Sequence, residues 1–308
     1  MALEIGTALL PVFFVLALGY TAGKLRLIDN RNVRSLDTLV MEIALPVSLF
    51  TSLASSSRAQ ITARWPLAVI SAVVMGIAYA GTEVLQRRVY RLTPAESAVQ
   101  ALTVAFPNCA AVGLPLLGSV LGPSAVLSVA VVLAVGSVTL SPVTLLVLER
   151  EQHRSRSIWP PIAASLHKPV VIGPVLGLAW SMLGIPLPHL AQVSLTEIGS
   201  VTAGLALFLT GLVLSAQTIE ISGNALTSTL LTVVVRPVLA FLAVRIAGLS
   251  GELAQETLLL LAIPAGFFGV LVGLDYDVRP PVAGMTLLFS TALSVVTISV
   301  LIALLPRL

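Results

Sequence analysis

The stretch FPNCAAVGLPLL, residues 106–117, interrupts a run of aliphatic residues in which a continuous helix is expected. It contains two prolines, an asparagine, a glycine and the only cysteine of the chain. Proline removes a backbone donor and clashes with the preceding turn, and glycine lets the chain leave helical geometry. The stretch therefore predicts a helix that is broken near its middle.

The composition around this stretch is that of a membrane protein. Of the 308 residues, 57% are hydrophobic and 10% are charged, and the mean hydropathy is +1.02. A soluble domain averages about 25% charged residues. The basic residues lie in short loops between apolar segments, which indicates membrane topology and no nucleic-acid partner. The fold class expected is an all-α integral membrane protein, because runs this long and apolar suit helices and not barrel strands.

Clusters of charged residues, proline or glycine divide the chain into ten apolar segments, each long enough to cross a bilayer core of about 30 Å. The segments are 3–23, 35–56, 66–89, 95–118, 124–148, 166–184, 193–216, 223–247, 252–274 and 281–305. The loops on one side carry twelve Lys and Arg residues and those on the other side carry four. The positive-inside rule therefore places the N- and C-termini outside the cytoplasm.

The two halves of the chain resemble each other at an offset of 157 to 159 residues. The matched residues include Pro11 and Pro169, Gly19 and Gly177, Ala44 and Ala203, Thr51 and Thr210, Pro107 and Pro264, and Thr139 and Thr297. Because each unit holds five segments, the second unit starts on the opposite side of the membrane and must be inverted. We therefore expect two five-helix repeats, 1–157 and 158–308, and inverted repeats with interrupted helices are typical of secondary transporters.

Segment nine carries a break at the position that matches the break in segment four. Such breaks are either structural kinks or the lining of a wet cavity, and two at matching positions favour a shared binding site. Asn108 can both donate and accept hydrogen bonds there. The candidate substrate-binding residues are Asn108, Pro107, Cys109, Gly113, Pro264, Ala265, Gly266, Arg236, Ser48 and Thr210. The helix-break residues expected are Pro107, Pro115, Pro264 and Gly269.

Several of these candidates have an alternative interpretation. Arg236, which Pro237 follows inside segment eight, could bind a substrate carboxylate, or it could form a structural ion pair or reach the outer interface. Glu42 is a candidate for proton coupling, or it could form a structural hydrogen bond. Cys109 could line the cavity or be a small apolar packing residue. The hydroxyls of Ser48 and Thr210 could instead bond to their own helices.

The stretch with Asn108, Gly113 and Pro115 resembles the Asn, Gly and Pro pattern of the auxin efflux carrier family, which includes plant auxin exporters and many bacterial carriers. Other stretches that resemble this family are IALPVSLFTSL in segment two, AGLALFLTGLVLS in segment seven and AIPAGFFGVLVGLDYD in segment nine. The resemblance covers nearly the whole chain. Within the family, PNCAAVGLPLL and IPAGFFG are most similar to the bacterial malonate-transporter branch.

The resemblance implies ten transmembrane helices in two inverted repeats, with broken crossover helices four and nine, as in bile-acid symporters. Helices 1, 2, 6 and 7 would form a scaffold, and helices 3–5 and 8–10 a transport core. The implied location is the bacterial inner membrane, as a multi-pass protein, and a homodimer through the scaffold helices is allowed. Ala110 stands where many bacterial members have glycine, so the resemblance does not determine the shape of the cavity.

The function expected is secondary active or facilitative transport of a small organic anion, malonate or another short carboxylate, by alternating access at the crossover of helices four and nine. The alternatives are a sodium-coupled organic-anion symporter of the bile-acid type, an auxin-like exporter of indole acids and a passive channel. An enzyme is not expected, because no GxSxG or HExxH motif is present. No cofactor and no metal site are expected, and the coupling ion, H⁺ or Na⁺, is left open.

Overall fold

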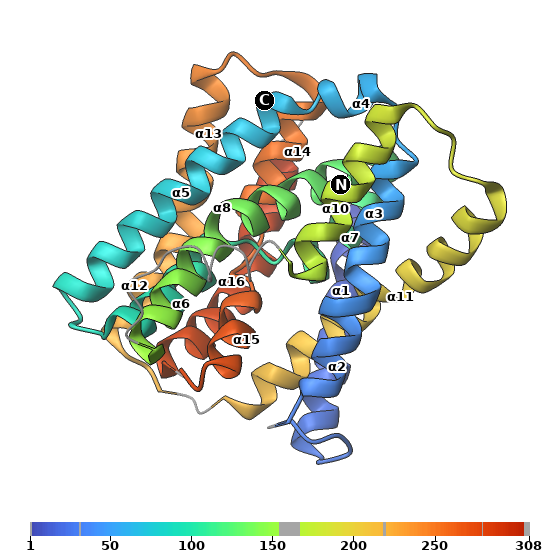
Figure 1. Ribbon diagram of the computed structural model, residues 1–308. Helices are drawn as coiled ribbons and strands as arrows, with labels where there is room; N and C mark the ends of the chain where they lie inside the picture. The colour runs from blue at the N-terminus through green and yellow to red at the C-terminus, as the bar shows by residue number, and fades with distance from the viewer. Residues whose placement is uncertain (1, 31, 154–166, 218–219, 279, 305–308) are drawn as a thin grey trace. The chain divides into compact units, whose positions relative to one another are not determined.

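The computed structural model describes residues 2–30, 32–153, 167–217, 220–278 and 280–304 (Figure 1). Every regular element within these ranges is a helix, which confirms the all-α prediction. The α-helices are α1 (Ala2–Lys24), α2 (Arg34–Thr38), α3 (Leu45–Ala54), α4 (Arg58–Thr62), α5 (Trp65–Arg88), α6 (Pro94–Ala105), α7 (Leu114–Val120), α8 (Val126–His153), α10 (Pro169–Leu183), α11 (His189–Ala216), α12 (Gly223–Leu230), α13 (Arg236–Ile246), α14 (Gly251–Ala262), α15 (Phe268–Asp275) and α16 (Pro281–Leu304).

Among the described residues, six helical stretches are long and apolar enough to cross a membrane. They are Arg34–Ala54, Arg58–Arg88, Val126–Glu151, His189–Ala216, Gly223–Ile246 and Pro281–Leu304. The predicted segments four and nine do not reach this length as single helices, because each is divided by its break. The protein is a multi-pass membrane protein, and the count of ten spans stays a prediction, as does the repeat boundary at 157, which lies outside the described residues.

In the described part of the chain, three helical segments contain a π-helical turn, and a proline follows each turn. The turns are η1 (Leu39–Ala44), η2 (Cys109–Gly113) and η4 (Leu231–Val235), and they end two residues before Pro46, Pro115 and Pro237. A proline lacks the N–H and crowds the carbonyl four residues earlier, and in all three segments that carbonyl lies inside the wide turn. A proline thus accompanies each wide turn, whereas Pro11, Pro142 and Pro174 lie inside α-helices without one.

The chain divides into two compact units, of which unit one comprises Met1–Ala68, Cys109–Val135 and His167–Ala216. Within it α1 packs along α11, and α10 packs along α3 (Figure 1). A Cβ atom added to Gly19 would lie 3.0 Å from the Cα of Phe208, and one added to Gly173 would lie 2.9 Å from the Cα of Pro46. The backbones approach this closely because the contact positions are glycines.

Unit two comprises Val69–Asn108, Gly136–Leu166 and Gln217–Leu308. Within it α6, α12 and α14 contact α16, α15 contacts α6, and α13 contacts α14. A part-buried amide pair joins α5 to α12, since Gln86 Nε2 donates to Asn224 Oδ1 at 2.8 Å and Asn224 Nδ2 donates to Gln86 Oε1 at 2.7 Å. The unit therefore fixes polar side chains between apolar helices by pairing them with each other.

Candidate functional site

Both broken helices end for the same local reason. Phe106 follows α6 with φ −89° and ψ 108°, and Ile263 follows α14 with φ −62° and ψ 157°. Each of them directly precedes a proline, and the residue before a proline is disfavoured in helical geometry and favoured in extended geometry. The sequence thus ends both helices and leaves a short extended stretch after each.

The two extended stretches pair with each other inside unit two. Pro107 and Ala265 form an isolated antiparallel bridge, and the backbone N–H of Asn108 donates to the carbonyl of Pro264 at 3.0 Å. The N–H of Gly266 donates to the carbonyl of Thr103 at 3.2 Å. These contacts join two breaks that lie about 157 residues apart in the chain, so the breaks form one structural feature, which we call the crossover (residues 106–108 and 263–267).

Side chains from neighbouring helices complete the crossover. Ser290 on α16 accepts a hydrogen bond at 3.1 Å from the backbone N–H of Ala265. The ring of Phe106 meets that of Phe268 edge to face, with centroids 5.5 Å apart. Phe106 also packs against Gly136 of α8, where an added Cβ would lie 2.6 Å from the ring. The break is therefore buried in protein, as unwound backbone at membrane depth requires.

Arg236 is a buried charged residue that binds the crossover. It is the first residue of α13, directly after the π-helical turn η4, and its side chain is 0% exposed. Its Nε donates to the carbonyl of Leu261 at 2.9 Å and its Nη1 to that of Val104 at 2.6 Å. Its Nη2 donates to the carbonyl of Ile263 and reaches that of Pro264 at 3.5 Å. One guanidinium thus binds carbonyls from the ends of both broken helices.

These bonds have an electrostatic consequence. The last carbonyls of a helix have no partner within it and carry partial negative charge. Val104 lies in the last turn of α6 and Leu261 in the last turn of α14, so both negative helix ends meet the same cation. The planar fork of an arginine suits several acceptors at once. Arg236 therefore satisfies and neutralises the half-helix ends that the breaks create.

The structure brings together six of the ten candidate substrate-binding residues. The six are joined through the bridge and the hydrogen bonds just described, and they are Pro107, Asn108, Arg236, Pro264, Ala265 and Gly266. Asn108 is 2% exposed. The other four belong to unit one, and they are Ser48, Cys109, Gly113 and Thr210. The hydroxyl of Thr210 donates to the carbonyl of Ala206 in its own helix at 2.7 Å, which is the structural alternative raised above.

Two of the expected break residues lie outside the unwound stretches. Pro115 is the second residue of α7, directly after the π-helical turn η2, so it lies beyond the break that ends α6. Gly269 is the second residue of α15 and contacts the backbone of α6. Glu42, the coupling candidate, lies in η1 of unit one with an exposed side chain.

Sequence reasoning did not single out Thr103, Ser290 or Gly136, because each is an ordinary small residue in an apolar helix. It also passed over Glu256, which is 1% exposed in α14, the helix that leads into the second break. The sequence did carry a signal for Glu256, because a glutamate in the apolar run ELAQETLLLLAIP is as unusual as Glu42 in segment two. Among the described residues, no group of three or more His, Cys, Asp or Glu residues could hold a metal ion.

We expect Ser290→Ala to lower the stability of the crossover by about 1–3 kcal/mol, because the buried N–H of Ala265 loses its acceptor. The measurement is the thermal unfolding midpoint of the purified protein in detergent. Ser294→Ala is the matched control, since Ser294 is buried in the same helix and, among the described residues, its hydroxyl bonds to Thr291 of that helix alone. An equal shift in both variants would contradict a role for the Ser290 hydroxyl at the break.

Comparisons with known proteins match nearly the whole chain. A family model described as membrane transport protein matches residues 4–302. The uncharacterized transporter YfdV of Escherichia coli K12 is 26% identical over 277 residues, which cover 88% of each chain. A protein of Rhizobium meliloti that is provisionally named a malonate transporter is 25% identical over 302 residues, covering 96% of this chain and 94% of that protein. These names describe membrane transporters rather than enzymes, and the chain belongs to the membrane transport protein family, that of the auxin efflux carriers.

Proposed function

We propose that this protein transports a small organic anion, malonate or another short carboxylate, by alternating access at the crossover. The observation that carries the proposal is the pairing of the two proline breaks, in which Pro107 bridges Ala265 and Asn108 bonds to Pro264. Paired breaks of this kind in a transporter expose unwound backbone to a substrate near the middle of the membrane. The relative named for malonate points to the substrate class.

The crossover has the groups that recognition of a carboxylate needs. Arg236 binds the negative C-terminal ends of α6 and α14. Its charge offsets theirs, so neither helix end repels an approaching anion. The second break is followed directly by the N-terminus of α15, which carries the partial positive charge. The Asn108 amide supplies a donor and an acceptor next to the backbone. Local charge at the crossover thus favours an anion.

The membrane arrangement that we propose has ten spans in two inverted repeats, with both termini outside the cytoplasm of a bacterial inner membrane. Helices 1, 2, 6 and 7 form the scaffold, through which a homodimer would form, and helices 3–5 and 8–10 form the moving core. The twelve to four distribution of Lys and Arg between alternate loops supports the orientation. The coupling ion is H⁺ or Na⁺, and the assays below vary both.

The test begins with binding. Purified protein is heated with malonate, succinate, acetate or indole-3-acetate, each with and without sodium. We expect malonate or a similar short carboxylate to raise the unfolding midpoint, because a ligand at 100 times its Kd stabilises the folded state by about 2.7 kcal/mol. Stabilisation by indole-3-acetate alone would indicate the auxin-like alternative, and stabilisation by none of the anions contradicts the proposal.

Transport is then measured by counterflow in proteoliposomes. Vesicles loaded with unlabelled substrate should accumulate labelled substrate transiently, because a carrier exchanges through one alternating site and a channel does not. Protein-free vesicles are the control. A dependence of net uptake on an imposed sodium gradient identifies a sodium symporter, whereas a dependence on a pH gradient identifies proton coupling. Equilibration without accumulation of label would overturn alternating access.

A further inference from the structure

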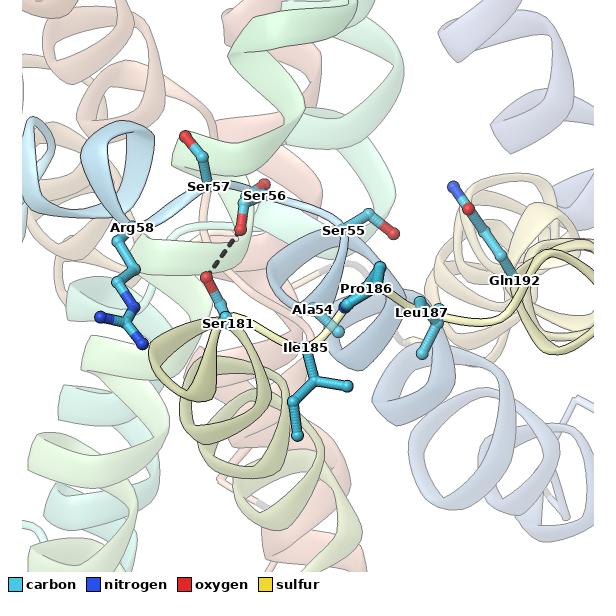
Figure 2. Close-up of a pocket in the computed structure, with 11 residues that line it drawn as sticks. Ala54, Ser55, Ser56, Ser57, Arg58, Ser181, Ile185, Pro186, Leu187 and Gln192 are labelled. Atoms are coloured by element: carbon cyan, nitrogen blue, oxygen red, sulfur yellow. Dashed lines mark hydrogen bonds between the residues drawn. The ribbon is translucent and has the colours of Figure 1, made fainter.

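A pocket of about 490 Å³ lies at the end of α3 and α10 in unit one, and none of its lining residues belongs to the crossover. Figure 2 shows the turn from Ser55 to Arg58 facing Ser181 of α10 and the segment that leads into α11. Its polar lining consists of Ser55, Ser56, Ser57, Arg58, Ser181 and Gln192. None of the lining residues is acidic, so the charge of the pocket is positive.

Arg58 has a defined position in this pocket. Its Nη2 lies 3.2 Å from the place where a Cβ of Gly184 would be, and Gly184 ends α10 with φ 70°. Only a glycine both adopts this left-handed turn without strain and leaves room for the guanidinium. Within the described ranges, the Arg58 side chain makes no hydrogen bond and no ion pair. Arg58 is exposed and lines the pocket, so its donors are open to solvent and to a ligand there.

The remaining polar groups divide into occupied and available ones. The hydroxyl of Ser181 donates to the carbonyl of Ser56 at 2.6 Å, and the hydroxyl of Ser57 accepts from the N–H of Gln60 at 3.2 Å. The first bond holds the turn against α10, and the second caps α4. The side chains of Ser55 and Gln192 have no hydrogen-bond partner in the described part of the chain. An arginine, a hydroxyl and an amide are thus open to the pocket.

We propose that this pocket binds a small oxyanion, a carboxylate or a phosphate group, with Arg58 as the charged donor and Ser55 and Gln192 as neutral donors. The guanidinium fork matches the two oxygens of such a group. Two sources carry this chemistry, a soluble anion and the phosphate of a lipid headgroup, because the pocket lies at helix ends of a membrane protein. The site does not depend on the proposed transport function, since all its residues lie in unit one.

The test uses Trp180, the neighbour of Ser181 in α10, as a fluorescent probe in a variant whose other two tryptophans, Trp65 and Trp159, are replaced by phenylalanine. Malonate and inorganic phosphate are titrated separately into protein in detergent without lipid. Native mass spectrometry then counts bound phosphatidylglycerol and phosphatidylcholine. Arg58→Gln is the test variant in both arms, and Arg245→Gln is the control, because Arg245 is an exposed arginine of unit two.

We expect Arg58→Gln to lower the affinity for one of these ligands by about tenfold or more, as the loss of a charged hydrogen bond predicts. Arg245→Gln should leave the affinity unchanged. A loss confined to malonate or phosphate in detergent identifies a soluble anion. A loss confined to phosphatidylglycerol identifies a lipid headgroup. If Arg58→Gln lowers only the unfolding midpoint, Arg58 merely balances the negative end of α10, and the proposal is overturned. Counterflow by the protein with Arg58 intact tests transport at the crossover separately from binding in this pocket.

Discussion

The Arg236→Gln variant is expected to lose carboxylate uptake completely while it still reaches the membrane. The guanidinium bonds to carbonyls of Val104, Leu261, Ile263 and Pro264, and it does so at 0% exposure. A glutamine has two donors on one nitrogen and cannot reach the ends of two helices. Each buried carbonyl left without a donor costs about 1–3 kcal/mol, so the two breaks lose the geometry in which they pair.

Arg236→Lys separates the charge of this residue from its shape. A lysine keeps the positive charge but presents its donors from a single point, so we expect it to satisfy one helix end and leave the other open. Uptake should fall by about tenfold or more, with an unfolding midpoint between those of the wild type and the glutamine variant. Counterflow and thermal unfolding of the three proteins, with Arg245→Gln as an exposed control, provide the measurement.

The substrate series distinguishes the two interpretations of Arg236. If the guanidinium acts by holding the breaks, Arg236→Lys lowers the maximal rate for succinate and acetate alike and leaves the ratio of their KM values unchanged. If it contacts the anion, the KM for the dicarboxylate rises more, because the second carboxylate loses its partner. Normal uptake by Arg236→Gln would contradict both interpretations at once.

The sequence predicted the helices and both breaks because their signals are local. Apolar runs of about 20 residues identify membrane helices, and a proline forces extended geometry on the residue before it, here Phe106 and Ile263. The match between Pro107 and Pro264 was visible as a repeat, and their pairing was implied only by the family resemblance. Local signals of this strength are frequent in helical membrane proteins, where lipid leaves few alternatives to a helix.

The partners inside the site could not be predicted in the same way. Arg236 bonds to backbone carbonyls at positions 104 and 261, and a carbonyl carries no sequence signal because every residue has one. The contact of Ser290 with Ala265 likewise depends on how two helices pack. Glu42 and Glu256 look alike in sequence, yet the first is exposed and the second buried, since helix rotation decides between them.

Gly269→Ala is expected to disrupt unit two strongly for a change of a single methyl group. A Cβ at this position would lie 2.6 Å from the backbone nitrogen of Thr103 and 2.9 Å from the carbonyl oxygen of Val99, both in α6. Backbone atoms of a helix cannot rotate away as a side chain can, so α15 must move from α6. Overpacking of this kind costs about 1–3 kcal/mol, and the movement pulls on the Gly266 to Thr103 bond at the crossover.

A matched control and a double variant make this prediction specific. Gly76 lies in α5 of the same unit, and an added Cβ there meets nothing within 4 Å, so Gly76→Ala should be neutral or stabilise by up to about 1 kcal/mol. The Thr103 hydroxyl also touches the new methyl group, and Gly269→Ala with Thr103→Ala removes that contact alone. We expect little recovery of uptake or of the unfolding midpoint, because the backbone contacts remain. Full recovery would mean that only side chains meet at this point and that α6 and α15 do not depend on a glycine to approach each other.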